Sequence, residues 1–291
     1  MRWQQLILGL LIFCMMNGNS LNAQRVKWKK RVHKPPLDVQ LFHSTLVANL
    51  PTTETLRQGN FEFIVSHRFI PALSSGFDNF WGVDGPAYNR LSLAYAITNR
   101  LMVELGRSNR LRNMDLTVKT KVFQNDHPVV PLVVGLRLGT AISPLNPEVY
   151  GRNRWHSRNF QYFGQLMVNT LIAKKVGLGI VPAWVYNSDL FSTDIQQTIA
   201  LGSYLQVYVS PSWNLWAEVA PVISGFQDGD TPFTFGIEFE TGGHFFKIFL
   251  TNSTRLNSAQ FLAGSGGRGT GMDQWHLGFT ITRLLRLGAK W

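Results

Sequence analysis

Apolar and polar residues alternate along most of the chain. Between positions 130 and 138 every even position is valine or leucine, whereas Gly135 and Arg137 stand between them. Between positions 232 and 240, Phe or Ile occupies the odd positions, and Glu238 and Glu240 have the other parity. Because successive side chains of a strand point to opposite faces, this pattern predicts β-strands with one large apolar face and one small or polar face. A soluble sandwich turns its apolar face inward and a membrane barrel turns it toward lipid, and local alternation is common to both.

The alternation extends over many segments, which are joined by connections of two kinds. The predicted strands are residues 60–69, 88–97, 101–108, 113–122, 129–139, 159–171, 176–187, 197–209, 214–224, 232–240, 244–252 and 273–291. Tight turns such as 98–100 and 173–175 alternate with mostly longer connections such as 140–158 and 253–272. Bacterial barrels have this asymmetry, with short periplasmic turns and longer external loops.

We therefore predict an all-β fold, a transmembrane antiparallel up-and-down β-barrel of about 12 strands in the outer membrane. Loops 140–158 and 253–272 are expected outside the cell, and the turn 173–175 in the periplasm. Residues 39–48 are either a further strand or a plug segment.

The C-terminal segment continues the alternation to the last residue. The apolar residues of one parity are Trp275, Leu277, Phe279, Ile281, Leu285, Leu287, Ala289 and Trp291, and Arg283 is the one exception. A last strand of this kind resembles the signal that the barrel assembly machinery reads. We therefore expect that machinery to be a partner, through the strand ending at Trp291.

The N-terminus has the three regions of a secretory signal peptide. Arg2 supplies the positive start, residues 6–16 are an apolar run too short to span a bilayer, and residues 17–22 lead to a cleavage site at Ala23. The predicted organisation is a signal peptide at 1–23, a basic periplasmic leader at 24–37 and the barrel domain at 38–291.

Composition and charge narrow the function classes. Cys14, the single cysteine, lies in the predicted signal peptide. Disulfides, thiolate catalysis and cysteine metal sites are therefore excluded for the mature chain. Aromatic residues make up 12% of the chain against 15% charged residues, which suits a protein at a membrane interface. The net charge of +11 is spread over loops and forms no single stripe, so no nucleic-acid partner is expected.

Two stretches resemble a known family. Ser66–Phe69 (SHRF) and Asn89–Asn109 (NRLSLAYAITNRLMVELGRSN) combine an Arg-bearing strand, an Ile-Thr-Asn turn and a Gly-Arg-Ser strand end. Over residues 40–291 the chain is similar to an uncharacterised outer-membrane β-barrel family of Gram-negative bacteria, a domain of unknown function. The resemblance implies the fold and the location. It implies no site residues, because the family has no assigned activity.

Motifs that carry chemistry are weak. The histidines form no metal-ligand spacing, and Gly264–Gly269 (GSGGRG) stands in a polar loop and lacks the strand before it and the helix after it that a dinucleotide site needs. Ser66 and His67 are neighbours in a predicted strand and point to opposite faces. We predict no catalytic residue, metal or cofactor, although twelve-stranded outer-membrane phospholipases keep a lipid-modifying barrel hydrolase as an alternative.

Strand parity places charged residues inside the barrel. The predicted lumen-lining charges are Arg90, Glu104, Lys119, Lys121, Arg137, Glu218, Glu238 and Glu240. Apart from Glu104, the early strands carry the basic residues and the late strands the acidic ones, with Lys247 as an exception on the acidic side. Opposed charges across a water-filled lumen would create a transverse field that favours small dipolar solutes, and interior glycines would leave room for water. Alternatively, the charges pair and close the lumen.

Arginines recur in the predicted external loops. The candidates for contact with lipopolysaccharide phosphates are Arg107, Arg110, Arg112, Arg152, Arg154 and Arg158, and the alternative is an ordinary solvated rim. Outer-membrane lipid and lipopolysaccharide are therefore expected partners. Three functions stay open: a passive pore or transporter for small polar solutes, a closed structural or partner-docking barrel, and a lipid-modifying barrel hydrolase.

Overall fold

The computed structural model describes residues 38–144, 151–269 and 271–286. The predicted signal peptide (1–23), the basic leader (24–37) and Trp291 lie outside the described residues. No helix in the described parts is long and apolar enough to cross a membrane.

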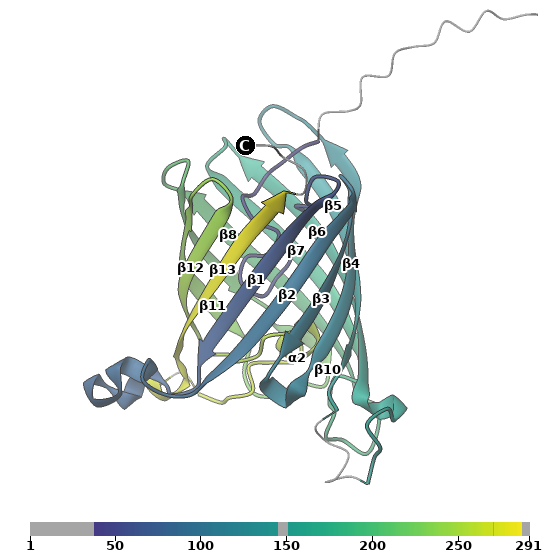
Figure 1. The fold of residues 1–291 in the computed structure, drawn as a ribbon, viewed down its shortest axis with the longest axis vertical. Helices are drawn as coiled ribbons and strands as arrows, with labels where there is room; N and C mark the ends of the chain where they lie inside the picture. Colours follow the sequence, from purple (N-terminus) through teal and green to yellow (C-terminus); the bar gives the residue numbers. More distant parts are fainter. Residues whose placement is uncertain (1–37, 145–150, 270, 287–291) are drawn as a thin grey trace, which may run out of the picture. The chain divides into compact units, whose positions relative to one another are not determined.

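The described chain is dominated by antiparallel strands (Figure 1). They are β1 (Asn60–Phe69), β2 (Ala87–Thr98), β3 (Leu101–Ser108), β4 (Met114–Asn125), β5 (Leu132–Ile142), β6 (Phe160–Ile172), β7 (Val176–Tyr186), β8 (Gln197–Tyr208), β9 (Trp213–Val219), β10 (Val222–Gly225), β11 (Phe233–Glu240), β12 (His244–Thr251) and β13 (His276–Arg286). Strands that are consecutive in the sequence pair, apart from β10, and β1 pairs with β13, so the sheet closes into a barrel. Both β9 and β10 pair with β8 and form one interrupted strand. Counted in this way, the barrel has twelve strands, as predicted.

Prolines explain two differences from the predicted boundaries. The strand expected at 214–224 is interrupted at Ala220 and Pro221, and the strand expected from 129 begins at Leu132, after Pro131. Proline has no N–H to donate to a β-ladder, so it interrupts or delays pairing. The last strand starts at His276, because residues 272–274 form a short 3₁₀ turn.

Exposure identifies the face that meets lipid. Leu105 and Ile180 are 55% and 52% exposed on the outer wall, whereas Lys119 and Glu218 are 4% and 1% exposed on the inner one. A soluble protein would bury the apolar set and expose the charges. The inversion is the one expected of a barrel whose outer wall contacts hydrocarbon, and it decides between the sandwich and the membrane barrel.

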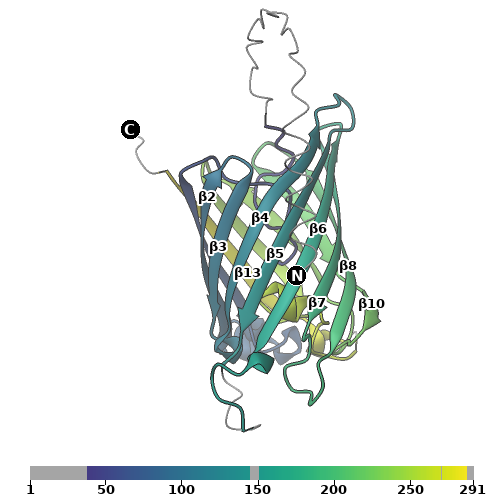
Figure 2. The same ribbon diagram turned by 90° about the vertical axis from the view of Figure 1, so that its right-hand side faces the viewer.

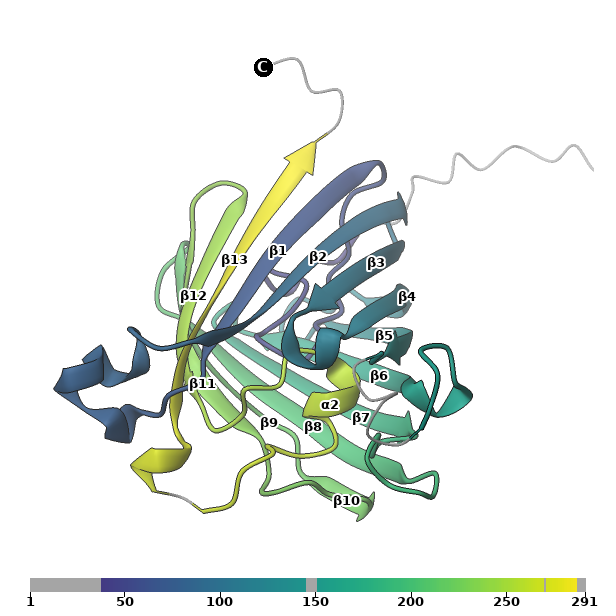
Figure 3. The ribbon, with the colours of Figure 1, turned by 60° about the horizontal axis from the view of Figure 1, so that its bottom comes forward.

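A segment of the chain before β1 occupies the barrel interior. Residues 38–59 run inside the wall rather than adding to it (Figures 1 and 3), and their one isolated bridge joins Leu46 to Pro51. Leu41, Phe42 and Leu50 of this segment are buried. Of the two alternatives for residues 39–48, the structure has the plug segment, and residues 38–59 are called the plug below.

A second segment enters from the opposite end. Residues 253–265 carry the short helix α2 (Ser258–Phe261) and are folded into the mouth of the barrel, where Phe261 and Leu262 are fully buried (Figure 3). The expectation that 253–272 is an external loop throughout is therefore wrong for its first half. Asn257 caps α2 by accepting a hydrogen bond from the Gln260 N–H, and apolar burial supplies the driving force. The glycines of 264–269 follow in a loop, not in a strand-to-helix turn.

The two ends of the barrel differ as expected for an outer-membrane barrel. The short hairpin turns lie together at one end, and the long connections lie at the other (Figure 2).

We expect an epitope tag inserted after Asp194, in the loop between β7 and β8, to bind antibody on intact cells. A tag inserted in the turn 173–175 should bind antibody only after the outer membrane is permeabilised. Labelling of the 173–175 tag on intact cells, with none after Asp194, would reverse the orientation.

Candidate functional site: the filled lumen and its loop-end mouth

The middle of the lumen is an apolar core. Leu41, Phe42, Val47 and Leu50 of the plug pack with buried apolar residues of the wall and of α2. The wall, α2 and its C-cap residue contribute, among others, Val133, Phe163, Met167, Val181, Tyr204, Trp216, Phe249, Phe261 and Leu262. Interior glycines, expected to leave room for water, instead make room for these side chains: a Cβ at Gly202 would lie 2.8 Å from Leu50 Cδ2. The middle of the lumen is therefore packed like a protein core.

Glu218 of β9 holds the tip of the plug. Its carboxylate accepts hydrogen bonds from the backbone N–H groups of Ala48 (3.3 Å), Asn49 (3.0 Å) and Leu50 (3.0 Å), and from Asn49 Nδ2 (2.6 Å). Asn49 Oδ1 in turn accepts a hydrogen bond from Arg68 Nη2 at 3.3 Å. Successive N–H groups that converge on one carboxylate form an anion-binding nest, which compensates for burying the charge.

Lys247 and Glu238 hold the plug from the neighbouring strands. Lys247 Nζ lies 2.9 Å from Glu238 Oε2 and donates to Ser44 Oγ (2.7 Å), to the Val47 carbonyl (2.6 Å) and to the Leu46 carbonyl. Ser44 Oγ also lies within hydrogen-bond distance of Glu238 Oε2, at 3.0 Å. In the sequence pattern Lys247 is the exception among the acidic residues of the late strands. In the structure it is the counter-charge of Glu238.

The base of the plug meets the two lysines of β4. Lys119 Nζ donates to the Thr45 carbonyl at 3.0 Å, and Lys121 Nζ lies 3.2 Å from Asp38 and 3.6 Å from Glu54. Glu54 also accepts from the N–H groups of Leu41 and Phe42 (2.8 and 3.2 Å). Burial raises the pKa of the Glu54 carboxyl above its ordinary value, and Lys121 and these two N–H groups oppose that shift.

Wall charges nearer the loop end pair with one another. Arg90 Nη2 lies 3.0 Å from Glu104 and 2.5 Å from Asp115, and Arg137 Nη2 lies 3.2 Å from the other Glu104 oxygen. Arg137 Nη1 donates to Ser258 Oγ at 2.6 Å and so ties α2 to the wall. Glu104, the acid on the predicted basic wall, is therefore the counter-charge of both arginines.

All eight predicted lumen charges face the interior, but they create no field across an open lumen. Seven are buried, and Glu240, near the turn end, is half-exposed with His43 Nδ1 at 3.4 Å from its carboxylate. In the described parts, each of these charges forms an ion pair or hydrogen bonds with wall or plug residues. Glu62, Arg68 and Asp115 are buried interior charges as well. Strand parity places them on the polar face, but they were not among the predicted lumen-lining charges.

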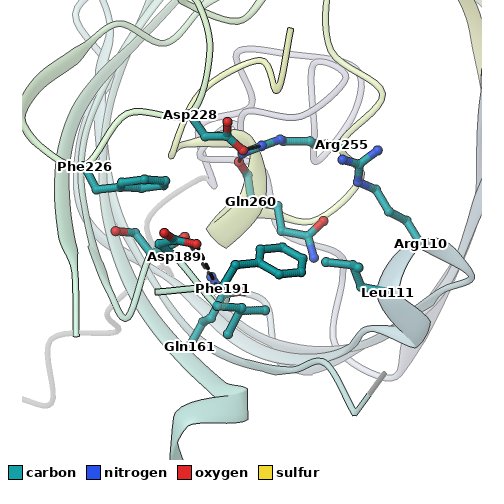
Figure 4. A pocket seen from close by; sticks show the side chains of 11 residues that line it. Arg110, Leu111, Gln161, Asp189, Phe191, Phe226, Asp228, Arg255 and Gln260 are labelled. Atoms are coloured by element: carbon teal, nitrogen blue, oxygen red, sulfur yellow. Dashed lines mark hydrogen bonds and ion pairs between the residues drawn. The ribbon is translucent and has the colours of Figure 1, made fainter. Parts of the chain in front are cut away.

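A small pocket lies at the loop-end mouth (Figure 4). It holds about 100 Å³, room for a few water molecules. Arg255 forms an ion pair with Asp228 on its rim, and Gln161, Ser188 and Gln260 are buried in its lining. Each of these last three has one side-chain polar atom without a hydrogen-bond partner within the described ranges, and the rest of the lining includes Leu111, Leu190, Phe191 and Phe226, so the pocket is of mixed polarity.

The predicted lipopolysaccharide-contact arginines differ in their surroundings. Arg110 donates to Thr254 Oγ1 at 2.9 Å, and Arg152 donates to the Leu190 and Ser192 carbonyls at 3.0 Å, so both hold loops together. Arg158 is half-buried. The remaining three, Arg107, Arg112 and Arg154, are exposed and line one groove on the outer wall.

Ser66 and His67 lie on opposite faces of β1, as their adjacent positions in the strand predict. Ser66 is buried on the inner face of β1, whereas His67 on the outer face stacks on Phe279 with 4.7 Å between ring centroids. No group of three metal-ligating side chains occurs in the part of the chain that the structure describes. Asp228 and Asp230 serve the loop: Asp228 pairs with Arg255, and Asp230 accepts from the Gly269 N–H at 2.6 Å.

An apolar outer wall, buried interior charges and a closed sheet of twelve strands define an outer-membrane β-barrel protein. The chain belongs to the family described as a membrane bound beta barrel domain, DUF5777, which matches residues 42–285. The family resemblance expected from the sequence is therefore confirmed.

Solved structures with a similar fold are outer-membrane barrels. The COG4313 outer membrane channel from Pseudomonas putida F1 is 16% identical, with a TM-score of 0.50 over 80% of this chain and 98% of that one. The NanC porin is 11% identical, with a TM-score of 0.46 over 78% and 98%, and LpxR from Salmonella typhimurium is 9% identical, with a TM-score of 0.36 over 77% and 99%. At these identities the likeness concerns the fold alone. A comparison with curated proteins found no match.

Proposed function

We propose that this protein is a closed outer-membrane barrel with a structural or partner-docking role, and that it does not act as a passive pore. The observation that carries the proposal is the plug. It fills the middle of the lumen with an apolar core and is held by Glu218, Lys247 and Lys119.

The energetics of opening favour the closed form. Withdrawing the plug would expose Leu41, Phe42, Val47 and Leu50 to water, at about 1.5–3 kcal/mol for each side chain. It would also leave Glu218 and Lys247 without the plug groups that satisfy them. Neither cost applies to a porin whose lumen is already filled with water.

The test is single-channel recording on the purified mature protein in planar bilayers. We expect no stepwise conductance from protein that shows the gel shift between unheated and heated samples that folded barrels give. A general porin inserted by the same protocol is the control for insertion. Reproducible unitary steps from the folded protein would overturn the proposal and restore the passive pore.

A further inference from the structure

A groove on the outer wall carries three exposed arginines at the loop end of the barrel. Arg107 ends the outward face of β3, Arg112 lies in the short connection between β3 and β4, and Arg154 lies in the loop before β6. The groove has a volume of about 420 Å³, and its other lining residues are Met114, Ile142, Pro144 and Trp155.

The three guanidinium groups have no acidic partner in the ranges that the structure describes, 38–144, 151–269 and 271–286. The arginines beside them differ, because Arg110 and Arg152 are occupied by hydrogen bonds to loop residues. Three cations around one groove, without an acidic partner among the described residues, produce a local positive potential, which favours an anion. Guanidinium groups bind phosphate oxygens in pairs and are suited to a phosphorylated ligand.

The groove continues along the wall toward the middle of the barrel as an apolar slot. The slot has a volume of about 170 Å³ and is lined by Leu105, Leu116 and Phe160, with Met114 and Ile142 shared between slot and groove. Its one acidic lining residue, Asp115, is 3% exposed and is paired with Arg90 in the lumen. A basic groove above an apolar slot matches an amphipathic molecule that has a phosphorylated head and a hydrocarbon tail.

The position of the groove in the membrane indicates the source of that molecule. The slot faces lipid, since Leu105 and Leu116 belong to the exposed apolar wall. Trp155 is 71% exposed at the groove, where an amphipathic ring suits the headgroup level. With the long loops outside the cell, the groove lies at the outer leaflet.

We propose that this groove binds the phosphorylated lipid A moiety of lipopolysaccharide. A lipid A phosphate lies among Arg107, Arg112 and Arg154, and one acyl chain follows the slot past Leu105 and Leu116. The site is on the outer wall, so it does not depend on whether the lumen is closed. Of the six arginines predicted from the sequence to contact lipopolysaccharide, this proposal assigns three to one ligand.

Binding of bisphosphorylated lipid A to the purified protein in detergent, measured by native mass spectrometry, tests the site. The variant combining Arg107→Gln, Arg112→Gln and Arg154→Gln should bind at least about tenfold more weakly, since it loses several charge-assisted hydrogen bonds. The matched control combines Arg100→Gln, Arg283→Gln and Arg286→Gln, exposed arginines at the turn end, and should bind like the parent. Equal binding by the two triple variants would overturn the site.

Two further lipids test whether the phosphate groups are needed for binding and whether the site prefers lipid A to an ordinary anionic phospholipid. Dephosphorylated lipid A should lose as much affinity for the parent protein as the groove variant loses for the phosphorylated form. Unchanged binding of the dephosphorylated form, or equal binding of phosphatidylglycerol, would overturn the assignment to lipid A. If the triple variant does not fold, Arg154→Gln alone, in a loop outside the wall, should still weaken binding several-fold, and no change would count against the proposal.

Discussion

Deleting residues 38–54 from the mature protein should turn a closed barrel into a conducting one. The deletion removes the buried side chains Leu41, Phe42, Val47 and Leu50, together with the backbone groups that satisfy Glu218 and Lys247. The freed interior charges are then hydrated, and a hydrated, charged lumen conducts ions. Residues 55–59 are kept, because Thr55 and Gln58 hydrogen-bond to Asn99 at the turn end and lead the chain into β1.

Planar-bilayer recording measures this effect, and sensitivity of cells to large hydrophilic antibiotics gives a second readout. A matched control replaces residues 38–54 by a flexible Gly-Ser segment of equal length. It should conduct as well, since it lacks the anchoring groups, and it separates loss of the contacts from loss of chain length. A folded deletion variant without conductance would contradict the prediction and would mean that residues 253–265 close the lumen by themselves.

Glu218→Ala should be the most destabilising single substitution in the lumen. It leaves the N–H groups of Asn49 and Leu50, and the Asn49 amide that also binds Arg68, without their acceptor. Removing one partner from a buried charged network costs about 3–5 kcal/mol in the free energy of unfolding, since the remaining groups are buried and unsatisfied. Glu218→Gln keeps one accepting oxygen and should lose about half as much.

The measurement is the midpoint of denaturant unfolding in lipid vesicles, followed by tryptophan fluorescence. Glu240→Gln is the matched control: Glu240 is half-exposed, so its midpoint should change by less than about 1 kcal/mol in equivalent free energy. Intermittent conductance of Glu218→Ala in planar bilayers should accompany the destabilisation, because the tip of the plug loses its anchor. Equal midpoints for Glu218→Ala and Glu240→Gln would show that the nest does not hold the plug.

The alternation of side chains determined the wall. Since strand side chains alternate strictly, residues such as Leu105 and Ile180 could be assigned to the lipid face, and Lys119 and Glu218 to the interior, without a structure. The same rule places Glu62 and Arg68 on the polar face of the first strand, although they were not among the predicted lumen-lining charges. Strand ends were less certain where prolines intervene, because Pro131 and Pro221 alter hydrogen bonding without changing the apolar pattern.

What fills the barrel was decided by tertiary structure alone. Residues 39–48 have no local feature that separates a strand from a plug, and residues 253–265 have the composition of an external loop. Their contacts join positions far apart in the chain: Lys247 binds Ser44 across 203 residues, and Glu218 binds Asn49 across 169. Alternation states that a charge points inward but not what it meets there. The partner of each charge depends on the register of all twelve strands and on which segments the wall encloses. The sequence therefore determined the barrel, and only the three-dimensional packing determined that its lumen is filled.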